Sequence, residues 1–126
     1  MKCTTRIRMG LNDAHYARNI INGSKIIQLF EDIAKELLIR NDGDEGLFKA
    51  YTNIEFISPV YAGDYIEVTG EIIRFGSTSR EIKFEAKKVA TQRVDICESA
   101  ADYLLEPKIV CKAIGTCVVL KEKQRF

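Results

Sequence analysis

Side chains suited to acid–base chemistry gather at and just before the only long amphipathic stretch of the sequence. Asp13 and His15, the single histidine, fall in the segment NDAHY, and Glu31 lies inside the amphipathic stretch that follows. Carboxylates and imidazoles are the usual general acids and bases of enzymes. Asp13, His15 and Glu31 are therefore the candidate catalytic residues, and a helix with the loop before it would have to position them.

The helix is expected from Lys25 onward, because apolar residues recur at steps of three and four from Ile26 to Leu38. Ser24 is the expected N-cap, and the two glycines of NDGDEG, residues 41–46, end the helix. The first N–H groups of a helix have no partner within it and lie at the positive end of its dipole. They can stabilise a negatively charged oxygen.

Alternating apolar and polar residues predict five strands around this helix. In the second strand, Phe48 and Phe56 are expected on one face and Tyr51 on the other. The segment ESAADYLL, residues 98–105, is expected to form either a short helix or an excursion that Pro107 ends. The strands are expected at residues 3–9, 47–58, 65–75, 80–90 and 108–122, with a long loop at 11–23 and a hairpin at 76–79.

One helix and five strands predict an α+β fold in which an antiparallel sheet wraps around the helix. The length predicts a single domain, residues 1–126. The last strand is apolar enough to be buried on both faces or to lie at an interface. Because one helix cannot cover five strands, and edge strands invite pairing, we expect a homodimer or a larger homo-oligomer.

Composition narrows the classes of function. A net charge of +1, spread along the chain, argues against nucleic-acid binding. No apolar run approaches the ~20 residues of a membrane span, and MKCTTRIRMG is no signal peptide, so we expect a cytoplasmic protein without a membrane partner. The four cysteines have neither CxxC spacing nor a paired histidine, so no metal site is expected. The C-terminal LKEKQRF is expected to be a solvated tail.

Three segments together resemble the hotdog-fold family of acyl-CoA thioesterases and dehydratases. They are NDAHYARNIINGSKIIQLFEDIA, IEFISPVYAGDYIEVTGEI and GSTSREIKFEAKK, in this order along the chain. A closer resemblance is to the ammonia-lyases of this fold, which interconvert 3-aminobutyryl-CoA with crotonyl-CoA and ammonia in lysine fermentation. It rests on the segments DAHYARNIINGSKIIQLFEDIA, LLIRNDGDEGLF and PVYAGDYIEVTGEI. The loop after Asp13 is about one residue longer than in the thioesterases and lacks their Asn-His pair. These two differences argue against a hydrolytic activity.

The resemblance implies an acyl-CoA thioester as substrate, with CoA as part of the substrate and no separate cofactor. The amides around Gly23 would polarise the thioester oxygen, while the candidate acids and bases would move the α-proton and hold the amine. In a dimer, Asp13 or His15 of one chain could face Glu31 of the other. The expected substrate-binding residues are Tyr16, Asn22, Gly23, Ser24, Ser77 and Thr78, and the basic residues that could meet the CoA phosphates are Arg74, Arg80, Lys87 and Lys88.

Other functions remain open at this point. An acyl-CoA thioesterase would use the same amides, and a non-catalytic acyl-CoA-binding protein would need neither acid nor base. Each candidate also has a structural alternative, since Asp13 could form a turn, His15 could satisfy backbone groups of its loop, and Glu31 could lie on the helix surface.

Overall fold

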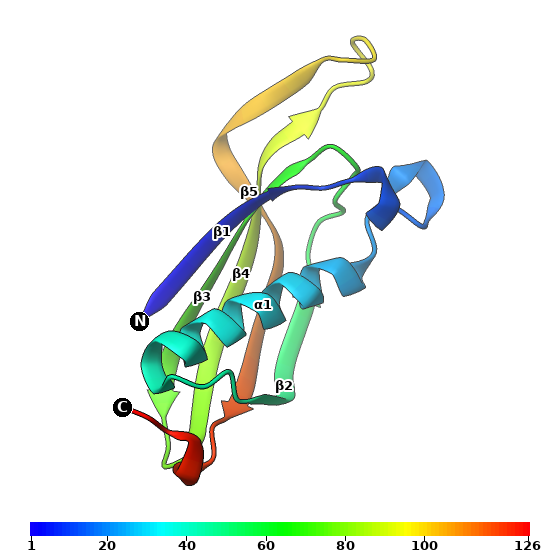
Figure 1. Ribbon diagram of the computed structural model, residues 1–126. Coiled ribbons are helices and arrows are strands. Elements are labelled where there is room, and N and C mark those ends of the chain that lie inside the picture. The colour runs from blue at the N-terminus through cyan, green and yellow to red at the C-terminus, as the bar shows by residue number, and fades with distance from the viewer.

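The wide apolar stripe of the helix determines the architecture, because it must be covered over most of its length. In the computed structural model, which describes residues 1–126, a five-stranded antiparallel sheet curves around helix α1 (Gly23–Asp42) (Figure 1). The sheet order is β1-β3-β4-β5-β2. The strands are β1 (Lys2–Arg8), β2 (Leu47–Phe56), β3 (Tyr65–Phe75), β4 (Ser79–Gln92) and β5 (Ala101–Val118). The α+β hotdog fold expected from the sequence is confirmed.

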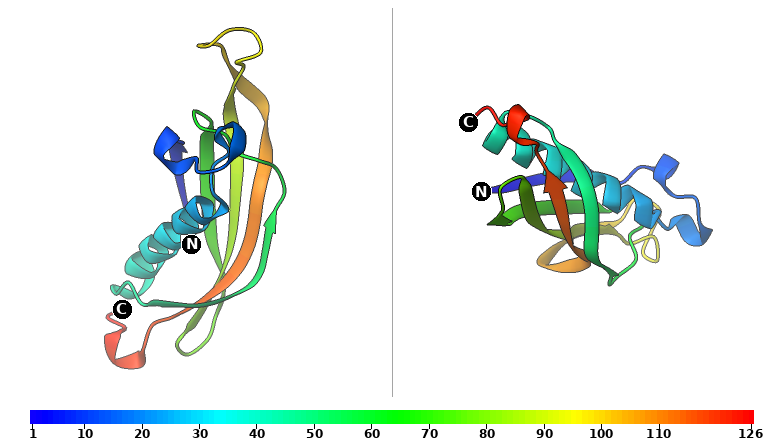
Figure 2. Two further views of the ribbon diagram at one scale, coloured as in Figure 1. Left: turned by 90° about the vertical axis from the view of Figure 1, so that its right-hand side faces the viewer. Right: turned by 90° about the horizontal axis from the view of Figure 1, so that it is seen from below.

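Helix α1 packs on the concave face of the sheet, closest to β3 (Figure 2). Phe30 of the helix stacks on Phe84 of β4 with ring centroids 5.0 Å apart. A Cβ at Gly70 of β3 would clash with the Ile33 side chain, so glycine permits this close approach. The helix lacks the apolar length needed to cross a membrane. Its core residues are Ile26, Leu29, Phe30, Ile33, Ala34, Leu37 and Leu38.

The expected N-cap is wrong by two residues. The cap is Asn22, with extended backbone, and Ser24 lies within the first helical turn. Neither serine nor asparagine caps the helix through its side chain, because the Asn22 Oδ1 instead accepts a hydrogen bond from the His15 N–H. At the other end the prediction holds, since Gly43 has φ of +70° and terminates the helix as a left-handed C-cap.

The predicted alternation in β2 is wrong at Tyr51. Register shifts lie between Phe48 and Ala50 and between Tyr51 and Asn53, and they place Phe48 and Tyr51 on the same side, against the core. Each bulge adds one residue and turns the following side chains to the other face. Toward the end of the strand, Phe56 is 58% exposed.

The segment 98–105 does not form a short helix, and the excursion expected as the alternative is built from paired strands. Strand β5 begins at Ala101, and β4 and β5 continue beyond the body of the sheet as a protruding arm closed by residues 93–100 (Figures 1 and 2). Pro107 does not end the segment, because a register shift between Lys88 and Ala90 leaves it unpaired within the strand. The strand ends at Val118, four residues earlier than expected.

The C-terminal LKEKQRF is exposed at every residue except Gln124, as expected of a solvated tail, and hydrogen bonds also hold it against the body. After the short turn η3 (Lys121–Lys123), the Gln124 side chain donates to the carbonyls of Ser77 and Val119, both at 2.9 Å. The Arg125 N–H donates to the carbonyl of Asp42, also at 2.9 Å. The tail therefore covers the C-terminal end of α1.

Candidate active site

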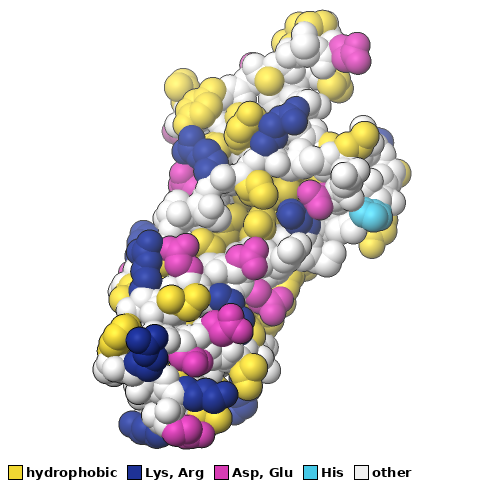
Figure 3. All heavy atoms as spheres, viewed as in Figure 1, with side chains coloured by type: hydrophobic (Ala, Val, Ile, Leu, Met, Phe, Trp, Pro, Cys, Tyr) yellow, Lys and Arg dark blue, Asp and Glu magenta, His cyan; other side chains and the backbone are white.

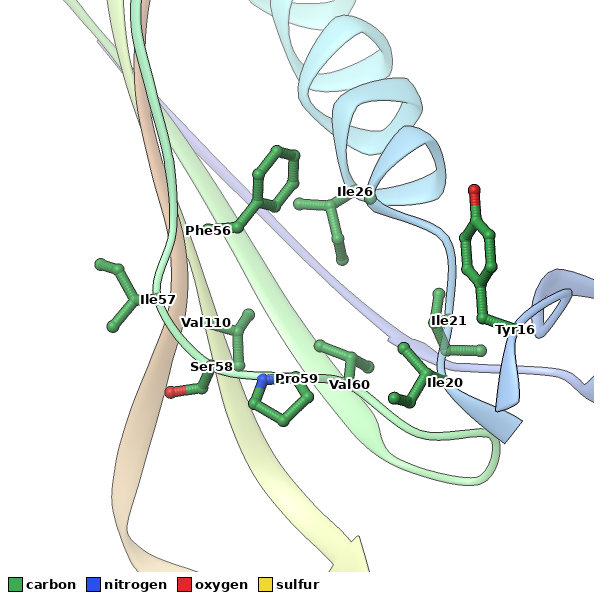
Figure 4. A pocket seen from close by; sticks show the side chains of 11 residues that line it. Tyr16, Ile20, Ile21, Ile26, Phe56, Ile57, Ser58, Pro59, Val60 and Val110 are labelled. Carbon is green, nitrogen blue, oxygen red and sulfur yellow. The ribbon is translucent and has the colours of Figure 1, made fainter. Parts of the chain in front are cut away.

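A cavity of about 500 Å³ opens where the first turn of α1 meets the connection between β2 and β3 (Figure 4). Its walls are mostly apolar, and the only polar side chains that line it are those of Tyr16 and Ser58. Such a volume and lining suit a small, largely apolar ligand group. The apolar walls come from Ile20, Ile21, Ile26, Phe56, Ile57, Pro59, Val60 and Val110.

The loop before α1 is folded back so that it forms one wall of the cavity. Arg18 and Asn19 both adopt left-handed backbone conformations, with φ of 60° and 59°. They reverse the chain within the short turn η2 (Ala17–Asn19). Ile21 then donates its N–H to the carbonyl of Val60 at 2.7 Å, and Ile20 forms an isolated bridge with Tyr61. The loop is thus fixed to the segment that follows β2.

The beginning of α1 presents unpaired backbone donors beside the cavity. The N–H groups of Gly23 and Ser24 have no acceptor within the chain. A Cβ at Gly23 would lie 2.9 Å from the Phe56 ring, so the ring covers the glycine and no larger residue fits without displacing it. Together with the positive end of the helix dipole, these donors can stabilise negative charge on a ligand oxygen.

The loop candidates meet around this helix terminus. The Asp13 carboxylate lies 3.9 Å from the Lys25 ammonium, and the Asp13 carbonyl accepts the N–H of Asn22. The His15 ring is exposed (cyan in Figure 3), and its Nε2–H donates to the carbonyl of Asn12 at 2.9 Å. His15 therefore satisfies a backbone group of its own loop, as the structural alternative predicts, while its Nδ1 makes no hydrogen bond within the chain.

Glu31 lies two turns further along α1 and does not line the cavity. Its side chain is exposed, on the flank of the helix nearest β2 and β5, where its negative charge adds to burial in raising the pKa of Tyr51 and of Cys117. Within one chain, no carboxylate lines the cavity. The donors and a free carboxylate are therefore separated in a single chain.

Ser77 and Thr78 are not brought to this site within the chain. They form the β3–β4 hairpin tip, which lies beside the C-terminal end of α1 (Figure 1). The Thr78 carbonyl accepts the N–H of Val119, and the Ser77 carbonyl accepts from Gln124. Both residues therefore lie near the opposite end of α1 from Gly23.

Two of the four basic residues considered for the CoA phosphates are buried in ion pairs, so that expectation is wrong for them. Arg80 forms a bidentate pair with Asp42, at 2.9 and 2.8 Å, and these bonds hold the pKa of the Asp42 carboxyl below its usual range. Lys88 lies 3.0 Å from the fully buried Asp64. Arg74 and Lys87 pair at the surface with Glu81 and Glu85.

Asp64 lies in the segment IEFISPVYAGDYIEVTGEI but was not among the candidate site residues. Its carboxylate accepts the N–H of Tyr61 at 2.9 Å and the hydroxyl of Thr91 at 2.8 Å, in addition to pairing with Lys88. These contacts close the corner between β2 and β3, which forms the wall of the cavity opposite the helix. Asp64 is thus a structural residue that shapes the site.

Comparison with known proteins places this geometry in a family. Residues 18–94 match the family described as "Thioesterase superfamily". The 3-aminobutyryl-CoA ammonia lyase of Acetoanaerobium sticklandii is 58% identical over 125 residues, which cover 99% of both chains. Among solved structures, the beta-alanyl-CoA:ammonia lyase of Clostridium propionicum is 36% identical, with a TM-score of 0.95 over 99% of this chain and 89% of that chain.

A hexameric hotdog fold thioesterase of Campylobacter jejuni shares the fold, with a TM-score of 0.76, 16% identity, and coverage of 97% of this chain and 86% of that chain. The matches at higher identity cover the loop, helix α1 and the β2–β3 corner that together form the cavity. The chain therefore belongs to the thioesterase superfamily of hotdog-fold proteins and, within it, to the acyl-CoA ammonia lyases.

Proposed function

We propose that this protein catalyses the reversible elimination of ammonia from 3-aminobutyryl-CoA, which gives crotonyl-CoA. The observation that carries this proposal is the 58% identity, over nearly the whole chain, to a lyase named for that substrate. The site geometry is compatible with it, because unpaired amides lie beside a mostly apolar cavity large enough for a short acyl group.

The amides of Gly23 and Ser24 would receive the thioester oxygen. Removal of the α-proton places negative charge on that oxygen, and fixed N–H donors at a helix N-terminus stabilise such charge without having to reorient. The electron pair of the α C–H bond then forms the double bond, and the pair of the β C–N bond leaves with the nitrogen. Apolar walls around the reacting carbons exclude water, which strengthens these interactions.

A second copy of the chain would supply the acid–base group that the cavity lacks. Strand β2 is an edge of the sheet, and its exposed apolar residues include Ile54 and Phe56. Pairing two β2 strands would extend the sheet across two subunits. We propose that Glu31 of one subunit then reaches the cavity of the other, where a carboxylate can accept the α-proton or pair with the ammonium group.

The reaction is tested by adding ammonium to crotonyl-CoA and following the enoyl-thioester absorbance together with free thiol. The lyase loses the absorbance and releases no thiol. Release of free CoA from acyl-CoA substrates would instead identify a thioesterase. Tight acyl-CoA binding with neither change would identify a binding protein. Both of these outcomes would contradict the proposal.

Glu31→Gln is the first substitution to measure. If Glu31 is the acid or base, turnover should fall at least ~10²-fold, because an amide cannot transfer the proton. Asp32→Asn is the matched control, since Asp32 is the adjacent exposed carboxylate on the same helix, and it should retain turnover. Equal turnover of Glu31→Gln and wild type would remove Glu31 from the mechanism.

A further inference from the structure

The hydroxyl of Tyr51 is the one buried side-chain polar atom that has no hydrogen-bond partner. Burying an unpaired hydroxyl destabilises a fold, whereas phenylalanine would fill the same space without that penalty. The ring itself is accounted for by packing, because it lies 4.4 Å from the Phe48 ring and 6.2 Å from the Phe84 ring, centroid to centroid. Packing leaves the hydroxyl unexplained.

The backbone of β2 is distorted in a way that directs this side chain inward. Register shifts flank Tyr51 on both sides, and they place it beneath α1. Bulges of this kind re-aim side chains and are frequent beside active sites. The partner residue on β5 is Gly115, at which a Cβ would lie 3.2 Å from the Tyr51 ring, so the opposite strand is also shaped to accept the ring.

Among the ionisable groups around Tyr51, Glu31 alone is a charged acceptor without a partner. Helix α1 contributes Glu31 and Lys35, and the Lys35 ammonium donates to the carbonyl of Gly46 at 2.7 Å. Strand β5 contributes Cys111 and Cys117, whose pKa values burial raises to about 11, so both thiols are neutral. Burial and the Glu31 charge raise the pKa of Tyr51, which keeps its phenol protonated as a donor.

We infer that Tyr51 is a positioning residue for Glu31, whose carboxylate accepts a hydrogen bond from the phenol once the second subunit and the substrate exclude water from it. The inference rests on the role of Glu31 in the proposed function. The bond holds the carboxylate in its ionised form and fixes its direction. Tyr51 itself does not touch the reacting atoms.

Tyr51→Phe removes only the hydroxyl. We expect kcat to fall roughly 10- to 100-fold, the worth of one hydrogen bond to a charged group, with KM for crotonyl-CoA nearly unchanged. The acid limb of the pH–rate profile should move to higher pH, because the carboxylate loses a donor that favours its ionised form. Thermal stability should be equal or higher. Tyr65→Phe, which removes an exposed hydroxyl from β3, should match wild type in every measurement.

A readout independent of turnover separates this inference from the proposed reaction. The carboxyl groups are labelled with ¹³C-glutamate, Glu31 is assigned by its loss in Glu31→Gln, and its titration is followed by NMR in wild type and in Tyr51→Phe, each with bound crotonyl-CoA and without it. A higher titration midpoint in Tyr51→Phe supports the inference even if crotonyl-CoA is not converted. An unshifted midpoint in both states overturns it, whatever the reaction.

Discussion

At the scale of single residues, the carboxylates differ in whether they have an ion-pair partner. Those with a partner are structural, and one without a partner is available for chemistry. Asp42 and Asp64 are buried, and each is neutralised by a buried cation, Arg80 or Lys88. Glu31 is exposed and has no ion-pair partner. The two members of a buried ion pair stay together, because separating them would leave an uncompensated charge in the interior. An exposed carboxylate is free to contact a ligand or a second subunit.

The cysteines divide in the same way, which gives a prediction for thiol reactivity. Cys97 is exposed in the arm, and hydrogen bonds from Ser99 lower its pKa, whereas Cys3, Cys111 and Cys117 are buried. Because the thiolate is the reactive form, a disulfide reagent at neutral pH should label one thiol per chain quickly and the other three only on unfolding. Cys97→Ser should abolish the fast phase. A fast phase that persists in this variant would contradict the assignment.

At the scale of elements, the two ends of α1 have different tasks. The N-terminal end leaves the N–H groups of Gly23 and Ser24 open beside the cavity. The C-terminal end is closed by Gly43, by the Asp42–Arg80 pair and by the terminal segment through Arg125. One end is anchored to the sheet and the tail, which holds the other end in position for binding.

The glycine at the open end should be intolerant of substitution. Gly23→Ala places a Cβ within 2.9 Å of the Phe56 ring, so the ring or the first turn must shift. We expect kcat to fall roughly 10²-fold, comparable to the loss of one oxyanion donor. The double variant Gly23→Ala/Phe56→Leu should recover part of this loss, since the smaller side chain relieves the contact. Full activity of Gly23→Ala would show that this turn does not bind the oxygen.

The closed end makes stability depend on pH. Because Arg80 lowers the pKa of Asp42 in the folded chain, the pair contributes stability above the unfolded pKa of about 3.9, and this contribution is lost as pH falls through the folded pKa. Asp42→Asn leaves the Arg80 charge buried, and should cost about 3 kcal/mol in urea unfolding at pH 7. The difference between the two proteins should shrink below about pH 4.

Asp95→Asn is the matched control, because Asp95 pairs with Arg93 on the exposed arm. This variant should unfold at nearly the same urea concentration as wild type at both pH values. If Asp42→Asn behaved in the same way as this control, the buried pair would have no part in holding the end of the helix.

At the scale of the whole molecule, the sheet has free edges at β1 and β2, and the cavity lies beside the end of the β2 edge. Lys, Arg, Asp and Glu side chains are interspersed over the face that carries α1 (Figure 3). The β2 edge instead exposes apolar side chains, among them Ile54 and Phe56. An apolar edge of this kind favours association with another copy.

Disrupting that edge should therefore abolish both assembly and activity. Ile54→Asp would place a charge within the proposed subunit contact, and we expect the mass in solution to fall from a multiple of 14.3 kDa toward that value. Turnover should fall with it, because Glu31 of one chain would then no longer reach the cavity and amides of another chain. Ile39→Asp, on the exposed face of α1, should retain both. An active Ile54→Asp monomer would show that one chain suffices.

The sequence by itself determined the elements whose signals are local. Helix α1 and the core faces of β3 and β4 follow from periodicity, and the C-cap follows from Gly43. The cluster of Asp13, His15, Tyr16, Asn22, Gly23 and Ser24 around the helix entrance also follows, because these residues are neighbours along the chain. The prediction of an acyl-CoA thioester substrate came from the resemblance of three segments, in the same order along the chain, to a known family.

Only the tertiary structure decided what depends on residues distant in the chain. The bulges that turn Tyr51 inward arise from the pairing of β2 with β5, and no local pattern encodes that register. The partners that bury Arg80 and Lys88 lie 38 and 24 positions away, at Asp42 and Asp64. Periodicity reports which face a residue prefers, whereas register and ion pairing depend on long-range contacts, which form only when the sheet closes around the helix.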